Sequence, residues 1–207
     1  MEESHRSDGS STVAEPFRLL GALATVVALG GIAVATVLDP TFSWTGDALS
    51  DLGVRERSAP VFNGGLILGG GVGVVYAAGL WRLGDAGDRS VALARVRAVA
   101  FALSMVAMAG IGAYDLTQPL HGPAAIGFYA LITAVFAIDG IARRRTTTGR
   151  VTLAFVPVHV VVWATFLLGL WPVSGLALPE LPGALMLAAW VWFVGPLRVV
   201  DTARAPT

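Results

Sequence analysis

The feature that most constrains the fold of this chain is a succession of six apolar runs, each about as long as a membrane is thick. An α-helix rises 1.5 Å per residue, so about 20 apolar residues cross a hydrocarbon core of about 30 Å. In lipid, only helices and closed barrels satisfy every backbone N–H and C=O group, and these runs are too long for barrel strands. The sequence therefore predicts an all-α polytopic membrane protein, a single bundle of six transmembrane helices. The expected spans are residues 17–38, 60–80, 98–114, 124–141, 151–171 and 183–200.

The composition agrees with a membrane location and excludes several kinds of chemistry. Only 14% of the 207 residues are charged, against roughly 25% in soluble domains. The chain has no cysteine and no lysine, which excludes disulfides, thiolate metal sites and lysine-dependent chemistry. The formal net charge is zero, so no nucleic-acid partner is expected. Membrane lipids are the expected partners, and no cofactor is predicted.

The two ends of the chain differ from the apolar middle. Residues 1–16 are polar and of mixed charge, which is typical of a segment that cannot bury enough apolar surface to fold alone. We expect three parts. They are a disordered cytoplasmic tail at 1–16, a six-helix transmembrane domain at 17–200 and a second cytoplasmic tail at 201–207.

The arginines predict the orientation. Six spans place both termini on one side, and that side carries 12 of the 14 arginines, since only Arg55 and Arg57 fall in loops on the other side. Because cytoplasmic loops carry an excess of basic residues, the sequence predicts a cell-membrane protein with both termini in the cytoplasm. The loops at 39–59, 115–123 and 172–182 would then face outward, with Glu180 in the last of them.

Polar residues gather at the predicted outer ends of the helices. Side chains of these types bind metals, activate water or hold polar head groups, although polar turns at the surface account for them equally well. No His-x-x-x-His spacing or second helical acid supports a metal site, so none is predicted. The candidates for an outer polar pocket are Ser50, Asp51, Asn63, Asp115 and His121.

Two polar residues fall inside predicted spans. Asp139 is an intramembrane acid, which by default suggests a function, but Arg143 follows four residues later and predicts an i,i+4 ion pair. His159 fits either a proton relay or a neutral ring that is hydrogen-bonded to a neighbouring helix.

The second apolar run carries glycine at every fourth position, at Gly65, Gly69 and Gly73. Such a small-xxx-small pattern lets a neighbouring membrane helix approach closely.

Three short motifs resemble one family. They are Asp47–Gly53 (DALSDLG), the FNGG sequence that begins at Phe62, and the segment 115–121 before an apolar run. The resemblance is to domain-of-unknown-function family 998, small six-helix membrane proteins of archaea and bacteria. It covers nearly the whole chain after the N-terminal tail and implies the six-helix fold and a membrane location, but no activity. The residues that it favours are Ser50, Asp51, Gly53, Asn63 and His121.

These observations predict an integral membrane protein of uncharacterised role, with an outward polar pocket that binds a lipid head group or a small polar ligand. One alternative is a membrane-embedded hydrolase acting on lipid, with His121 and an aspartate as acid/base or metal ligands. The other is a small transporter that uses Asp139 and His159. No catalytic residue is assigned.

Overall fold

The computed structural model describes residues 5–87 and 91–200, and over these residues the predicted all-α fold is confirmed. The helices are α1 (His5–Leu38), α2 (Ala59–Gly87), α3 (Val91–Ala113), α4 (His121–Ala142), α5 (Thr147–Leu167) and α6 (Ala177–Ala189). There are also two short elements. The 3-10 helix η1 (Leu49–Gly53) lies between α1 and α2, and the π-helical turn η2 (Trp190–Val194) directly follows α6. Among the described residues, six stretches are long and apolar enough to cross a membrane, and the sixth combines α6 with η2.

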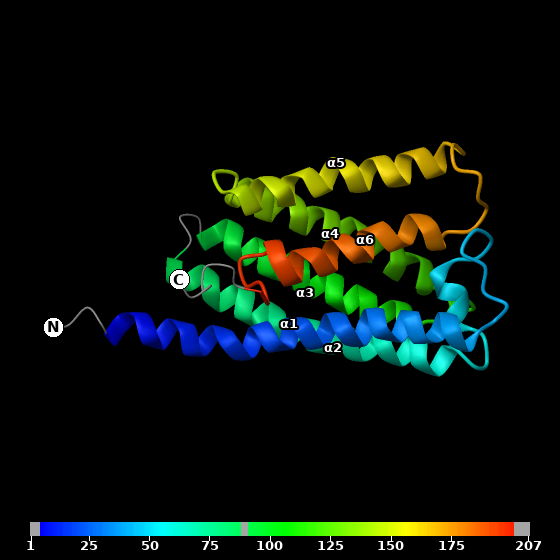
Figure 1. The fold of residues 1–207 in the computed structure, drawn as a ribbon, viewed down its shortest axis with the longest axis horizontal. Helices are drawn as coiled ribbons and strands as arrows, with labels where there is room; N and C mark the ends of the chain where they lie inside the picture. The colour runs from blue at the N-terminus through cyan, green and yellow to red at the C-terminus, as the bar shows by residue number, and fades with distance from the viewer. Residues whose placement is uncertain (1–4, 88–90, 201–207) are drawn as a thin grey trace.

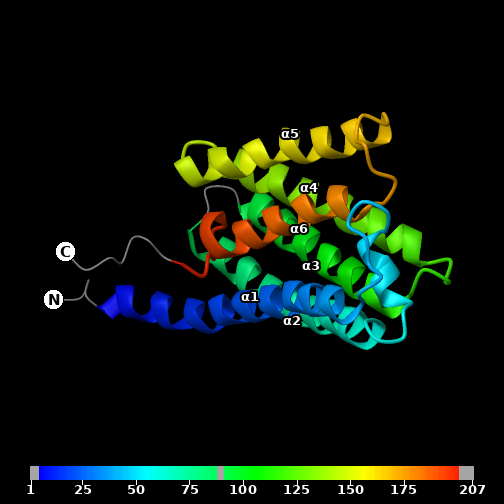
Figure 2. The ribbon, with the colours of Figure 1, turned by 45° about the vertical axis from the view of Figure 1, so that its right-hand side comes forward.

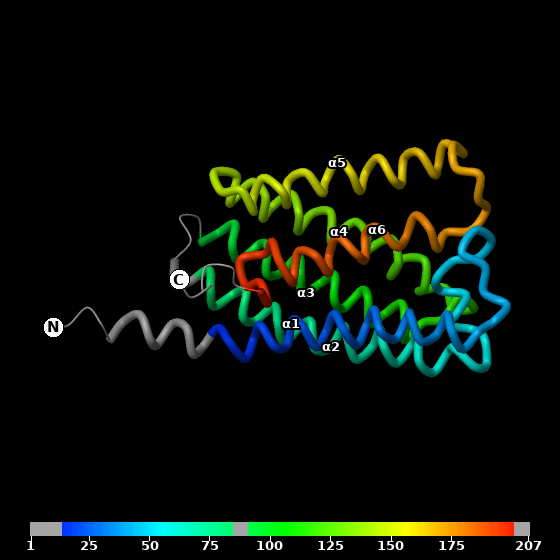
Figure 3. The backbone as a smooth tube through the Cα atoms, in the orientation of Figure 1, coloured from blue at the N-terminus to red at the C-terminus, as the bar shows by residue number. Residues whose placement is uncertain are grey.

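The first five helices form a row in which each packs antiparallel to the next. Helix α6 runs along one face of that row (Figure 1). The rotated view in Figure 2 shows α6 between α1 and α5, in front of α3 and α4. The tube in Figure 3 shows that the first coloured turn of α1, in blue, lies toward the same end of the bundle as η2, in red. We call this end of the bundle the terminal end. The opposite end contains η1, and we call it the η1 end.

Glycines set the spacing of the first three helices. A Cβ atom on Gly65 would lie 3.1 Å from the Cα of Gly31, and one on Gly69 would lie 2.9 Å from the Cβ of Ala28, so both glycines let α2 approach α1. Gly73, the third of the series, instead faces α3, where a Cβ would clash with Met105. The glycine pattern therefore serves two helix contacts, one on each side of α2.

Several boundaries differ from the prediction; α3, for example, begins at Val91 instead of residue 98. Helix α1 begins at His5, within the range expected to be a disordered tail, and its membrane-length stretch begins at Ala14. Helix α6 begins at Ala177 and its apolar stretch ends at Val194, whereas the sequence suggested a span over 183–200. Residues 1–4 and the predicted tail at 201–207 lie outside the described residues.

Candidate functional site

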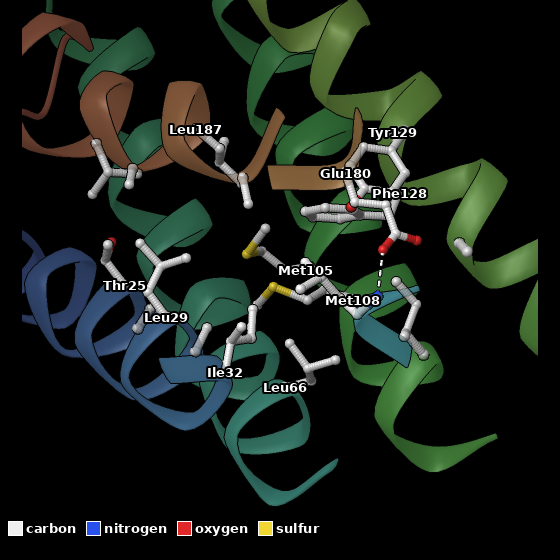
Figure 4. A pocket seen from close by; sticks show the side chains of 18 of the residues that line it. Thr25, Leu29, Ile32, Leu66, Met105, Met108, Phe128, Tyr129, Glu180 and Leu187 are labelled. Atoms are coloured by element: carbon white, nitrogen blue, oxygen red, sulfur yellow. Dashed lines mark hydrogen bonds between the residues drawn. The ribbon is translucent and has the colours of Figure 1, made fainter. Parts of the chain in front are cut away.

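A cavity lies between α6 and the row formed by α1 to α4. The empty space between its walls is about 860 Å³ when its open side is included. Its wall is mainly apolar, and Figure 4 shows Ile32, Leu66, Met105, Met108 and Leu187 pointing into it from four different helices.

The cavity exists because the two helices on either side of it present small side chains. Gly21, Ala24 and Ala28 line it from α1, and Ala184 and Ala188 line it from α6. Large apolar residues at these positions would fill the space by direct packing, as they do in most protein interiors.

The length of the cavity is between one half and about two thirds of the hydrocarbon thickness of a bilayer. On α1 it extends from Gly21 to Ile32, a rise of about 16 Å along the helix axis. On α2 it extends from Phe62 to Tyr76, a rise of about 21 Å. The hydrocarbon core is about 30 Å thick, so the cavity is at least as long as one leaflet is deep.

The open side of the cavity lies between α1 and α6. Helix α1 contacts η1 at one end and η2 at the other. Between these contacts the lining residues Thr25 and Leu29 of α1 and Ala184 and Ala188 of α6 stay partly exposed. All four belong to membrane-length stretches.

The η1 end of the cavity is polar. Glu180, at 7% exposure, lies in the first turn of α6 and accepts a hydrogen bond through Oε2 from the backbone N–H of Leu49 at 2.8 Å (Figure 4). No described residue donates a hydrogen bond to its other oxygen, Oε1. Ser50 of η1 and His121 of α4, both buried, line the same end, as does Tyr129.

The hydrogen bond that His121 forms shows which of its ring nitrogens carries the proton. Its Nδ1 lies 2.7 Å from the carbonyl oxygen of Tyr114. A carbonyl can only accept, so Nδ1 carries the proton, and Nε2 is an acceptor whenever the ring is neutral. The hydroxyl of Ser50 forms no hydrogen bond with any described residue. Ser50 and His121 therefore keep unused hydrogen-bonding capacity at this end, as Glu180 does.

Polar groups deeper in the cavity are already satisfied. Thr25 donates to the carbonyl oxygen of Gly21 at 2.9 Å, and the Tyr76 hydroxyl donates to that of Leu197 at 2.9 Å. The cavity is thus apolar along its length and has free hydrogen-bonding groups only where η1 covers it, among the described residues.

Docking of two loops places Glu180 beneath η1. The backbone N–H groups of Ser174 and Ala177 donate at 3.0 Å to the carbonyl oxygens of Thr45 and Asp47. Gly175 sits so close to the backbone of Asp47 that a Cβ atom would clash with it. This contact fixes the start of α6 against the loop that carries η1.

A small ionic network holds the same loop. Arg55 lies 2.8 Å from Asp39 and 3.0 Å from Asp47. Hydrogen bonds from Thr41 and then Arg55 lower the pKa of Asp39 to about 2, and the backbone N–H of Ser43 and then Arg55 lower the pKa of Asp47. Lowered pKa values mean that this network contributes stability at neutral pH and loses it only as the carboxylates protonate in acid.

Three of the predicted pocket residues act locally instead of lining the cavity. Asn63 donates to the carbonyl oxygen of Gly53 at 2.9 Å and so ties α2 to η1. Asp51 accepts from the backbone N–H of Ala48 at 2.7 Å and caps η1. Asp115 accepts from the backbone N–H and the hydroxyl of Thr117, contacts that lower its pKa.

Asp139 lies at the terminal end, fully buried. Arg143 forms the i,i+4 ion pair that the spacing predicts, Arg97 of α3 lies 3.1 Å away, and Trp190 of η2 donates to Asp139 at 2.8 Å. Arg143 also donates to the carbonyl oxygen of Val194 at 3.0 Å. The cluster joins α3, α4 and the end of the sixth span. Arg97 was expected in a cytoplasmic connection and is instead a buried part of this cluster.

His159 is a neutral ring held by its neighbours. The indole N–H of Trp163 can only donate, and it lies 3.1 Å from Nε2, so Nε2 accepts and Nδ1 carries the proton. Nδ1 lies 2.8 Å from the hydroxyl of Thr133 on α4. Of the two interpretations of His159, this geometry fits the hydrogen bond to a neighbouring helix.

Among the described residues, no three His, Asp or Glu side chains converge as metal ligands do. The residues that do converge on the cavity are Ser50, His121 and Glu180. Glu180 was missing from the predicted site, because two prolines around it made residues 172–182 resemble a loop. An acid directly before an apolar run was the signal that could have identified it.

The fold defines a polytopic helical membrane protein, and its bundle encloses a mainly apolar cavity. The family model described as "Protein of unknown function (DUF998)" matches residues 22–195, and the chain belongs to this family. No curated protein and no solved structure shows significant similarity to the chain.

Proposed function

We propose that this protein binds the hydrocarbon chain of a single membrane amphiphile inside its helix bundle, with the head group at the η1 end. One observation carries the proposal: an apolar cavity at least as long as one leaflet is deep ends at three buried polar side chains, Ser50, His121 and Glu180. An apolar wall with few polar groups at one end matches the chemistry of an amphiphile. The predicted polar pocket thus becomes the head-group end of a longer site.

The opening between α1 and α6 supports entry of the ligand from the bilayer. An amphiphile already inserted in one leaflet has its chain parallel to the helices and at the depth of the opening. It can enter sideways without exposing its chain to water, which the hydrophobic effect would oppose.

Binding is favoured over the two alternatives by the state of the candidate residues. A hydrolase built on a serine and a histidine needs a hydrogen bond between nucleophile and base, and none joins Ser50 to His121 in the described structure. A transporter that used Asp139 and His159 would need them free to exchange partners, whereas both are engaged by side chains from other helices or turns.

The test is to fill the cavity. Ala184→Phe should abolish the retention of lipid during purification, because the larger ring occupies the space between α6 and α1. Native mass spectrometry of protein extracted in mild detergent measures the lipid bound. Ala33→Phe is the matched control, because Ala33 is exposed on α1 and does not line the cavity. Equal lipid retention by wild type and Ala184→Phe, with both proteins folded, would refute the proposal.

We also propose that the protein lies in the cell membrane with the η1 end outward and both termini in the cytoplasm, which places the cavity in the outer leaflet. The arginine distribution supports this, and the two acids paired with Arg55 neutralise one of the two arginines at the η1 end.

The absence of cysteine from the sequence permits a clean test of the orientation. In intact cells, a membrane-impermeant thiol reagent should label Leu116→Cys, which is exposed at the η1 end. Arg145→Cys, exposed at the terminal end, should be labelled only after lysis. The reverse pattern would place the cavity in the inner leaflet and contradict the proposed orientation.

A further inference from the structure

The charges at the η1 end of the cavity specify the head group of the ligand, an inference that rests on the proposed function. We infer that the cavity selects a long-chain amine, an amphiphile whose head group carries a protonated amine and neither phosphate nor carboxylate.

The first ground is the carboxyl group of Glu180. It is almost completely buried, one oxygen accepts from Leu49, and the other lines the cavity without a partner among the described residues. A buried charge is costly unless it is paired. A bound ammonium group would supply the missing partner in the place where the ligand head group lies.

The second ground is the absence of positive charge from the wall. Among the described lining residues there is no arginine, and the chain contains no lysine. Arg55, at the same end of the bundle, already pairs with Asp39 and Asp47. Asp51 lies close enough to Glu180 to interact with it electrostatically. A phosphate or carboxylate head would therefore meet like charge and find no counter-ion.

The third ground is the number of acceptors. A protonated primary amine has three N–H donors and no acceptor. The η1 end offers an acceptor with unused capacity from each of three elements: Oε1 of Glu180 on α6, Oγ of Ser50 on η1 and, when its ring is neutral, Nε2 of His121 on α4. The site can therefore accept a hydrogen bond from each donor of the ligand.

The experiment compares two probes of equal chain length, an alkyl primary amine and the corresponding fatty acid, in nanodiscs of uncharged lipid. Native mass spectrometry gives the ratio of amine-bound to acid-bound protein. Glu180→Gln removes the charge and keeps an oxygen that can accept from Leu49, so the fold should persist. Glu56→Gln is the matched control, because Glu56 is exposed at the same end and does not line the cavity.

Wild type and Glu56→Gln should prefer the amine, and Glu180→Gln should lower the amine-to-acid ratio by about tenfold or more. Because the two probes partition differently into lipid, the change in ratio between variants is the measured quantity. An unchanged ratio in folded Glu180→Gln, or a wild-type preference for the acid, would overturn the inference while leaving the proposed function intact. Failure of wild type to bind either probe would instead refute the proposed function.

Discussion

Asp139→Leu is expected to lower the free energy of unfolding by about 3–5 kcal/mol, the cost typical of removing one partner from a buried ion pair. The carboxylate is fully buried and is shared by Arg97 of α3 and Arg143 of α4, while Trp190 donates to it from η2. Without it, two guanidinium groups inside the bundle lose their common counter-charge. Thermal and denaturant unfolding in detergent measure the effect.

The control for this prediction is the same change at an exposed acid. Glu56→Leu also removes a carboxylate, but from the surface, where substitutions usually change stability by less than about 0.5 kcal/mol. If Asp139→Leu were as stable as Glu56→Leu, the cluster would not hold α3, α4 and η2 together, and the packing of their apolar residues would have to do so.

Gly69→Leu is expected to destabilise the bundle by about 1–3 kcal/mol, the usual cost of overpacking. A Cβ atom at Gly69 would already lie 2.9 Å from the Cβ of Ala28 and 3.0 Å from the carbonyl oxygen of Ala24. A leucine there must push α1 away from α2, and backbone atoms cannot yield as a flexible side chain can. Unfolding in detergent is again the measurement.

Ala78→Leu, on the same helix, is the matched control. Ala78 is exposed, so a leucine there would contact lipid and should leave stability within about 0.5 kcal/mol of wild type. Similar stability of Gly69→Leu and Ala78→Leu would mean that α1 and α2 can separate at little cost.

The two stabilising features lie on either side of the cavity and give it a fixed frame. Glycine contacts hold α1 against α2, and the Asp139 cluster holds η2 against α3 and α4. Between them, α1 and α6 keep a gap lined by small residues. A binding site whose surrounding helices are held in place on both sides is preorganised for its ligand.

Sequence predicted the polar end of the site only in part. Ser50 and His121 were predicted because polar residues of the outer loops and outer helix ends lie at one membrane depth. Asp51 and Asp115 share that position but bond to their own loops, since a short acidic side chain in a turn finds backbone N–H groups nearby. No feature of the neighbouring sequence distinguishes Ser50 and His121 from Asp51 and Asp115.

Glu180 was assigned to a loop because Pro179 and Pro182 suggested that the helix begins later. Pro179 lies in the first turn, where backbone N–H groups have no intrahelical acceptor to lose, and Pro182 lies inside the helix at the loss of one backbone hydrogen bond. The helix therefore starts at Ala177 and carries Glu180 into the bundle. Arg97 was likewise assigned to a cytoplasmic connection, because only the fold shows that Asp139 lies opposite it.

The sequence alone determined the number of spans, the all-α class, the family and the residues at which helices approach closely. These follow from properties read along one segment: its length, its hydropathy and the spacing of its glycines. Tertiary structure decided where the cavity lies, which polar groups line it and which charges are buried together. These depend on contacts between α1, α3, α4 and α6, which are far apart in the chain, and a local pattern does not record which distant helix a side chain will face.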